Sequence, residues 1–151
     1  MHNKKKEIVE ITVPTKAIRI KHATCVNGHS LMDEKVLIND NPAITVLARY
    51  GDEEGLIHLD PVYGSFQNMW EITVPKDECV ELYCPTCLVS LSEHGQLCDE
   101  CLAQTFAIYL PHGGMVEACL RNGCHYHKLQ FTDSEEIGQK LLEEHYFDNM
   151  F

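Results

Sequence analysis

The chain has 151 residues and a formal net charge of -11, with 12 Lys and Arg against 23 Asp and Glu. This length allows one ordinary domain or two very small ones. The negative charge argues against a nucleic-acid partner, because affinity for phosphate depends on Lys and Arg. The longest apolar stretch, 103–110, is far shorter than a membrane span, so we expect no membrane partner and a cytoplasmic protein.

The first 67 residues are predicted to form a β-rich module. β-branched residues and intervening turn sequences indicate short strands at 7–13, 17–20, 36–38, 43–50 and 56–59. The turns lie at Asn39–Pro42 and at Gly51–Gly55, where Asn, Asp, Gly and Pro cluster.

An internal repeat suggests that residues 68–131 form a second, related module. Glu10-Ile-Thr-Val-Pro14 recurs letter for letter as Glu71-Ile-Thr-Val-Pro75, and a shift of about sixty residues also superimposes Ser30-Leu31 on Ser90-Leu91. Within the second module, 103–110 and 115–120 flank Pro111-His-Gly-Gly114 and predict a β-hairpin.

Residues 132–151 change character. Asp133 and Glu136 resemble a capping box, and Ile137, Leu141 and Tyr146 follow at helical spacing, which predicts a helix from Ser134 to about Phe147. The predicted fold is therefore mainly β (small α+β): tandem zinc-ribbon-like β modules held together by metal, with a C-terminal α-helix.

The cysteines point to metal binding. The chain has eight, and two Cys-x-x-Cys hooks, Cys84 to Cys87 and Cys98 to Cys101, are separated by ten residues. In the reducing cytosol such pairs favour a soft metal over disulfides. Four candidate pairs are available: Cys25 with His29, Cys84 with Cys87, Cys98 with Cys101, and Cys119 with Cys124, where His125 or His127 can replace one member of the last. Zinc takes four ligands, so we expect two zinc ions.

Several ways of sharing these pairs remain open. Neighbouring pairs can join, with Cys84/Cys87 and Cys98/Cys101 on one ion and the remaining pairs on another. Alternatively, Cys98/Cys101 joins Cys119/Cys124 across seventeen residues, a zinc-ribbon spacing, and Cys25/His29 meets Cys84/Cys87 between the repeats. An interleaved arrangement is the third possibility.

The metal ligands do not repeat between the modules. At a shift of about sixty, Ile38 and Asn41 stand where the second module has Cys98 and Cys101, and Asp60 stands where it has Cys119. The first module therefore cannot close a four-ligand site alone and must borrow ligands from the second.

The remaining cysteine and several histidines lack partners at ligand spacing. Cys79, in a strand context, is most simply a small core residue. The histidines His58, His94, His112 and His145 are expected at the surface or at the rim of a site.

Two segments resemble a known family. Cys25-x-x-Gly28-His29, followed after a strand-rich interval by Leu82-Tyr83-Cys84-Pro85-x-Cys87, resembles the small zinc-binding gamma subunit of the acetone carboxylase family. Asn27 stands where the family's first turn has its second cysteine, and the portion from Cys98 to His127 has no counterpart there. The resemblance implies a non-catalytic subunit of a large cytosolic carboxylase.

The leading functional hypothesis is a zinc-binding structural or interaction subunit of a multi-subunit enzyme, with larger subunits or a second copy of itself as partner and no catalysis of its own. The chain has no phosphate-binding glycine loop and no nucleophile elbow. One alternative is a rubredoxin-like electron carrier with a single iron in a four-cysteine site, although Leu88 and Leu102 stand where rubredoxin hooks usually have Gly. Another is a hydrolase or lyase with an open metal site built from Cys119, Cys124, His125 and His127.

Overall fold

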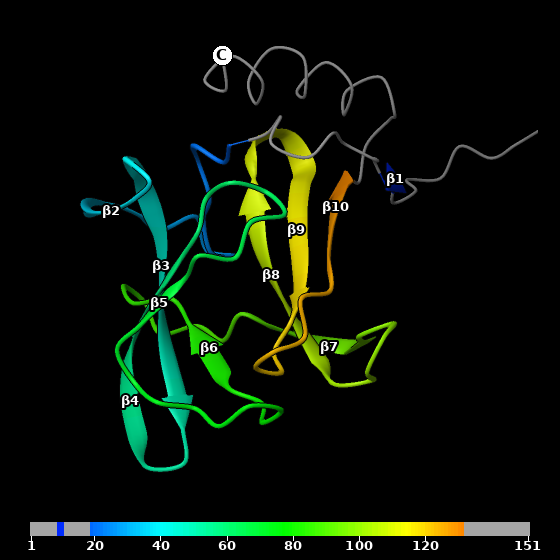
Figure 1. Cartoon of the computed structure of the whole chain (residues 1–151). Helices are drawn as coiled ribbons and strands as arrows, with labels where there is room; N and C mark the ends of the chain where they lie inside the picture. The colour runs from blue at the N-terminus through cyan, green and yellow to red at the C-terminus, as the bar shows by residue number, and fades with distance from the viewer. Residues whose placement is uncertain (1–8, 11–18, 132–151) are drawn as a thin grey trace, which may run out of the picture.

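The computed structural model describes residues 9–10 and 19–131, and these consist mainly of β-strands (Figure 1). The mainly β class predicted from the sequence is confirmed. The predicted C-terminal helix and most of segments 7–13 and 17–20 lie outside the described residues. Over the part of the chain that the structure describes, no helix has the length and apolar character needed to cross a membrane.

The strands form two antiparallel sheets. The first has the order β2-β3-β4-β5, with β6 also paired to β3, and the second has the order β1-β10-β9-β8-β7. Their bounds are β1 (Val9–Glu10), β2 (Met32–Ile38), β3 (Asn41–Tyr50), β4 (Glu53–Leu59), β5 (Met69–Trp70), β6 (Glu81–Tyr83), β7 (Ser92–Leu97), β8 (Gln104–Leu110), β9 (Gly114–Cys119) and β10 (His127–Phe131), with a short 3-10 turn, η1 (Pro111–Gly113), between β8 and β9.

Turn chemistry explains the hairpins. The β8–β9 hairpin predicted around Pro111 is confirmed, and its turn places His112 at φ 63°. Between β2 and β3 the turn residues Asn39 and Asp40 both have positive φ, 51° and 68°. Asn and Asp tolerate this left-handed conformation, and two such residues in a row make the two-residue turn whose twist suits a hairpin.

Strand β7 is the longest of the strands that the sequence did not predict. It lies in the stretch between the two Cys-x-x-Cys hooks, where the sequence analysis predicts no strand, and it pairs with β8 across a bulge between Ser92 and Leu97. It lacks β-branched residues, contains Gly95, and four of its six residues are exposed. An exposed edge strand shows little of the alternating hydrophobicity that identifies strands in a sequence.

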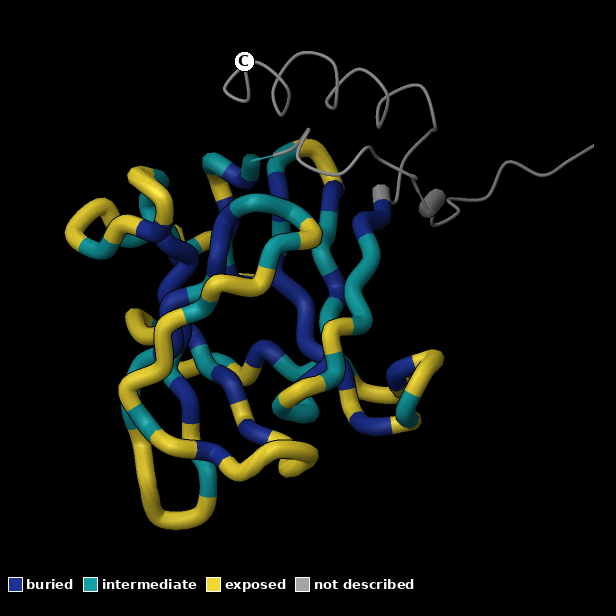
Figure 2. The backbone as a smooth tube through the Cα atoms, viewed as in Figure 1, coloured by how far each residue is buried: buried dark blue, intermediate teal, exposed yellow. Residues whose placement is uncertain are grey.

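Both sheets contribute to one hydrophobic core. Ile44 and Val46 of β3 and Ile57 of β4 belong to the same buried cluster as Ile108 of β8 and Leu129 of β10 (Figure 2). A second, much smaller buried cluster consists of Cys98, Ala103 and Cys119. The two repeats therefore share their interior.

The internal repeat is visible in the backbone hydrogen bonds. Ile20 N donates to Pro61 O at 2.8 Å, and Val80 N donates to Leu120 O at 3.1 Å. The donors are 60 residues apart and the acceptors 59. The first sheet, β2-β3-β4-β5, and the strands β7-β8-β9-β10 of the second follow the same order, as a duplicated unit would.

The repeats also exchange a segment. Thr24, just before the first candidate pair, forms a bridge with Tyr109 of β8 in the second repeat. Conversely β6, just before Cys84, pairs with β3 of the first repeat, with Tyr83 opposite Leu47. The segment before each of these two ligand pairs is thus paired with a central strand of the other repeat. This pairing brings Cys25 and Cys84 to the region between the sheets.

The register of the repeat corrects one sequence comparison. Leu37 of β2 lies opposite Pro42, whereas its counterpart Leu97 of β7 lies opposite Gln104, so the offset grows from 60 to 62 across this turn. The second repeat places four residues, 99–102, between Cys98 and Ala103, where the first has the two-residue turn 39–40. Asn41 is therefore the first residue of β3 rather than the counterpart of Cys101, and the first repeat has no hook at this position.

Candidate metal centres

The two Cys-x-x-Cys hooks have the same local backbone. At the first, Leu88 N donates to Cys84 O at 2.8 Å, Cys84 N donates to Val89 O at 2.9 Å, and Thr86 N points at Cys84 Sγ at 3.4 Å. The hook at Cys98 repeats all three bonds with its own residues, at 3.0, 2.7 and 3.3 Å. N–H groups aimed at a sulfur stabilise its thiolate form, which is the form that binds metal.

The structure brings eight predicted ligands together in two groups of four. In each group the candidate donor atoms all lie within 4.8 Å of one another. The central group lies between the repeats and consists of Cys25, His29, Cys84 and Cys87. The hairpin group lies at the end of the β8–β9 hairpin opposite its turn and consists of Cys98, Cys101, Cys119 and Cys124. None of these cysteines is in a disulfide.

The central group has the dimensions of a tetrahedral site. Zinc–sulfur bonds of about 2.3 Å and a zinc–nitrogen bond of about 2.0 Å give tetrahedron edges of about 3.8 Å between sulfurs and about 3.5 Å from sulfur to nitrogen. Cys25 Sγ lies 3.8 Å from Cys87 Sγ and 3.6 Å from His29 Nδ1. The donor set, three thiols and one imidazole, suits zinc.

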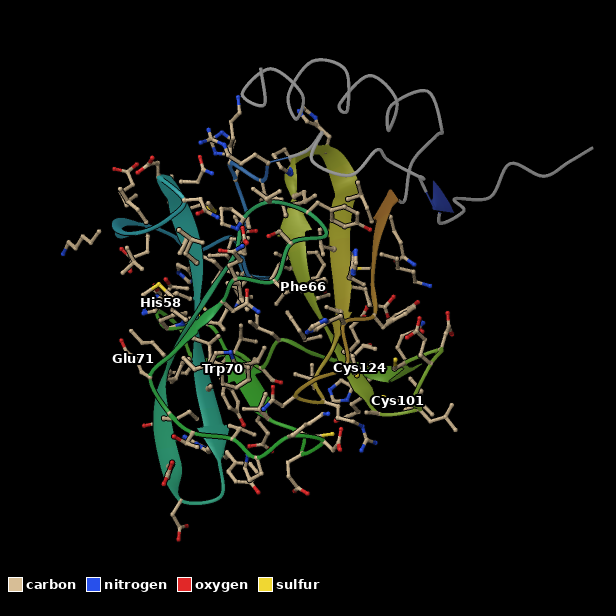
Figure 3. The ribbon with its side chains drawn as sticks, viewed as in Figure 1. His58, Phe66, Trp70, Glu71, Cys101 and Cys124 are labelled. Atoms are coloured by element: carbon tan, nitrogen blue, oxygen red, sulfur yellow. The ribbon has the colours of Figure 1, made fainter. Side chains whose placement is uncertain are left out.

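The hairpin group has similar spacing with sulfur alone. Cys98 Sγ lies 3.7 Å from Cys124 Sγ, and Cys101 Sγ lies 3.5 Å from Cys119 Sγ. Cys98 and Cys119 are buried, while Cys101 and Cys124 are partly exposed. Figure 3 shows Cys101 and Cys124 close together at the hook end of the second sheet.

Of the pairings left open by the sequence, the geometry shows the one in which Cys25/His29 meets Cys84/Cys87 and Cys98/Cys101 meets Cys119/Cys124. The donors of the neighbouring and interleaved arrangements are not brought together. The strand exchange explains this outcome, because each segment before Cys25 and Cys84 is paired with the opposite repeat.

His127 and His125 lie outside both groups. His127 Nδ1 is 2.8 Å from the backbone oxygen of His125, and the His125 ring stacks on Phe66 with centroids 4.2 Å apart. The four residues of the predicted open hydrolase site are therefore not assembled, since Cys119 and Cys124 face Cys101 and Cys98 instead.

Two minor predictions about partnerless residues are wrong. Cys79 is exposed, forming a backbone bridge with Arg121, rather than filling the core. His58 is buried rather than at the surface, because Thr45 Oγ1 lies 2.8 Å from its Nδ1 and Glu71 Oε2 lies 3.2 Å from its Nε2 (Figure 3). His94 and His112 are exposed as expected, and His145 lies outside the described residues.

One partly exposed thiol in each group, Cys87 or Cys101, has a lowered pKa. The side-chain amide of Asn27, 3.5 Å from Cys87 Sγ, lowers the pKa of Cys87 to about 6. The backbone N–H of Ala103 likewise lowers the pKa of Cys101 to about 6. Hydrogen bonding to Cys25 raises the pKa of His29. Each group thus presents a thiolate to an incoming cation.

One buried thiol of each group behaves in the opposite way. Burial raises the pKa of Cys84 in the central group and of Cys119 in the hairpin group. A metal must therefore displace protons from these thiols, and binding weakens as the pH falls. The same burial would shield these two sulfurs from water and would slow the exchange of a metal ion bound to them.

Two supporting residues escaped the sequence analysis. Asn27, noted only as a departure from the family turn, donates to Cys87 Sγ rather than acting as a ligand. Arg121 forms a hydrogen bond with Cys101 that raises the pKa of the guanidinium, which sets a fixed positive charge beside the four sulfurs. In the sequence, Arg121 is separated from Cys119 by one residue, but ligand spacing alone does not distinguish such neighbours.

Comparisons with known proteins give no family assignment: no family model, curated protein or solved structure matches the chain. The two donor groups are compatible with metal binding and with zinc-ribbon-like modules on their geometry alone.

Proposed function

We propose that the protein is a non-catalytic zinc-binding structural subunit that docks on a larger subunit of a cytosolic enzyme. The observation that carries the proposal is the closure of both donor groups. Each offers four protein donors within 4.8 Å, so a tetrahedral ion has no position left for water or substrate. Closed sites of this kind stabilise folds rather than catalyse reactions.

Two exposed leucines support a docking role. Leu88 and Leu102 occupy the same position in the two hooks, are 61% and 72% exposed, and have φ of 63° and 67°. A left-handed conformation costs a non-glycine residue roughly 1–2 kcal/mol. An exposed leucine side chain does not offset this cost, because it buries no apolar surface in the isolated chain. Val26, in the turn before His29, is also 61% exposed. These exposed apolar side chains lie in the turns that carry ligands of the two donor groups, and they are suited to burial against another protein.

The carboxylase is the finer part of the proposal. It rests on the resemblance of Cys25-x-x-Gly28-His29 and Leu82 to Cys87 to the gamma subunit of the acetone carboxylase family. Both segments belong to the central group, which ties the repeats together. In such a host, ATP-dependent activation and catalysis belong to the large subunits.

The test combines metal content with co-purification. We expect two zinc ions per chain by elemental analysis, and a larger subunit in fixed ratio when the tagged full-length chain is purified gently from its native cell. Leu88→Gly and Leu102→Gly remove the apolar tips and relieve the left-handed strain. We therefore expect both variants to keep two ions, to be about 1 kcal/mol more stable, and to lose the large subunit.

The matched control is Leu37→Ser, which removes an exposed leucine of β2 away from the hooks and should keep the partner. A monomer with no partner contradicts the docking role. A partner that is not a carboxylase contradicts the finer proposal alone.

A rubredoxin-like iron site is a second candidate for the hairpin group only, because its four donors are all sulfur. Iron at this position would colour the purified protein red, and zinc would leave it colourless. The central group contains His29 and does not have the rubredoxin donor set.

A further inference from the structure

A cavity lies between the two sheets, and its wall reaches Cys119 and Cys124 of the hairpin group. Its volume is about 220 Å³, and it is mainly apolar. The inner wall is aliphatic and comes from both repeats, including Ile44, Ile57, Leu82, Ile108 and Val116. An engineered cavity of about 150 Å³ lined by such residues binds benzene, so this one has room for a benzene ring with a short alkyl substituent.

Aromatic rings surround the cavity's polar end. The Phe66 and His125 rings stack with an interplanar angle of 9°, and the His127 ring meets Phe66 edge-on at 5.2 Å and Tyr63 at 4.8 Å. Trp70 of β5 also lines the cavity. In Figure 3, Phe66 and Trp70 lie on the segment that runs across the space between the sheets.

The hydrogen bond of His127 fixes what this end can recognise. Its Nδ1 is 2.8 Å from the backbone oxygen of His125, and a carbonyl oxygen only accepts, so Nδ1 carries the proton. In the neutral ring Nε2 is then an acceptor, and it has no hydrogen-bond partner among the described residues. Gly64 lies opposite: a Cβ there would be 3.8 Å from Nε2, and φ of 87° suits glycine.

Two other polar groups of the wall are already engaged, whereas the buried Arg121 Nε has no hydrogen-bond partner among the described residues. The Asp60 carboxylate accepts bonds from Val62 N, Ser65 Oγ and Gln67 N, and Asn122 Nδ2 donates to Val74 O at 2.8 Å. A ligand is therefore offered a mainly apolar cavity in which His127 Nε2 is an available acceptor. A ligand that covers this acceptor without donating a hydrogen bond to it leaves a buried polar atom unpaired, which is unfavourable. The acceptor therefore selects a ligand that brings one donor.

We propose that the cavity binds a small, uncharged, mainly apolar molecule with a single hydroxyl donor, of the alkylphenol class. The ring and alkyl group lie between the sheets, and the hydroxyl donates to His127 Nε2. Cys119 and Cys124 of the hairpin group form part of the cavity wall, but the inference does not depend on the docking role.

The test uses the metal-loaded full-length chain and two probes, 4-ethylphenol and ethylbenzene, which differ by one hydroxyl. Binding is followed in proton–nitrogen NMR spectra, with the indole N–H of Trp70, the only tryptophan, as a reporter. We expect shifts confined to cavity residues and about fivefold tighter binding of the phenol, the effect of one net hydrogen bond.

Two variants separate the chamber from the acceptor. His127→Phe should bind both probes equally, whereas His94→Phe, on exposed β7 outside the cavity, should keep the preference for the phenol. Ala118→Leu, which adds volume to the cavity wall, should weaken both probes by more than tenfold, with Val116→Phe as the alternative if that variant does not fold. Absence of cavity shifts, unchanged binding to a folded filled variant, or a phenol preference that survives His127→Phe would each overturn the proposal.

Discussion

The turn after the third long strand has the same backbone hydrogen bonds in the two repeats but a different residue at its first position. Val62 N donates to Asp60 Oδ1 at 3.0 Å in the first repeat, and Arg121 N points at Cys119 Sγ at 3.4 Å in the second. The next backbone bond also matches, Ser65 N to Val62 O at 2.9 Å in the first repeat and its counterpart in the second at 3.1 Å. One backbone turn is therefore compatible with either a carboxylate or a thiol at its first position.

The difference lies in what the turn faces. Cys119 faces the hook of Cys98 and Cys101, and the four sulfurs form the hairpin group. Asp60 has no hook opposite, because the first repeat has only the two-residue turn 39–40, and its carboxylate is satisfied by donors of its own loop. A metal site in this fold thus requires both the turn and the hook, and the first repeat replaces the site with hydrogen bonds.

The largest expected effect separates the two metal groups. Cys25 and Cys84 belong to the main core, whereas Cys98 and Cys119 belong to a small cluster of their own. We expect Cys84→Ser to lose one ion and to unfold the chain cooperatively, with a loss of more than about 5 kcal/mol, since structural zinc contributes about 10–16 kcal/mol in small domains. Cys98→Ser should lose one ion but leave the main core folded.

Hydrogen exchange with mass spectrometry distinguishes these outcomes. For Cys98→Ser, protection should fall only near 98–103 and 119–126, and for Cys84→Ser it should fall across both sheets. Equal loss of protection in the two variants would show that the hairpin group is as central to the fold as the other group.

A smaller effect is expected where hydrogen bonds replace the metal. Asp60 is 8% exposed and accepts three bonds, of which the shortest is from Ser65 Oγ at 2.6 Å. Asp60→Ala leaves three donors without their partner and should cost about 2–3 kcal/mol in denaturant unfolding, with two ions still bound. Asp60→Asn, which keeps one acceptor oxygen, should cost less. Loss of an ion in either variant would contradict the separation of this turn from the metal groups.

Much of the site could be predicted from the sequence because ligand spacing is a local property. The hooks at Cys84 and Cys98 and the pair Cys119 and Cys124 follow from short intervals between ligand types. The pairing of the groups could not be decided, since it depends on the exchange of Thr24 and β6 between the repeats, a long-range contact that no spacing encodes.

The mainly β class and the β8–β9 hairpin were predicted from the sequence. Elements whose structure depends on tertiary contacts rather than on the local sequence pattern were missed. Strand β7 has little β-propensity and owes its pairing to β8. The repeat was detected from letters at one fixed shift, but the true offset changes from 60 to 62 at the hook, which a fixed shift cannot show. His58 is polar by type yet buried, because Thr45 and Glu71 satisfy both ring nitrogens.

The smallest effect concerns a buried polar cluster in each sheet. His58 of β4 and Glu117 of β9 lie at equivalent positions, next to Thr45 and Thr105, respectively. In the second sheet Thr105 Oγ1 also contacts Glu93, and Lys128 Nζ lies 3.6 Å from Glu117. Two acidic groups therefore share a site where the first sheet has an imidazole.

This contrast predicts a pH dependence confined to the second sheet. Burial, with the nearby Glu117, raises the pKa of Glu93 to about 7 from 4.5. Because the folded state holds this proton more tightly than the unfolded state, Glu93 makes stability decline as the pH rises from about 4.5 to about 7. Glu93→Gln should therefore be about 1 kcal/mol more stable than the parent chain at pH 8, a value reduced for partial exposure, and the gain should vanish near pH 5. The comparison is made in metal-saturated denaturant titrations, with Asp33→Asn at the matched position of the first sheet as the control variant. A gain that persists at pH 5 would assign the effect to packing rather than to the shared proton.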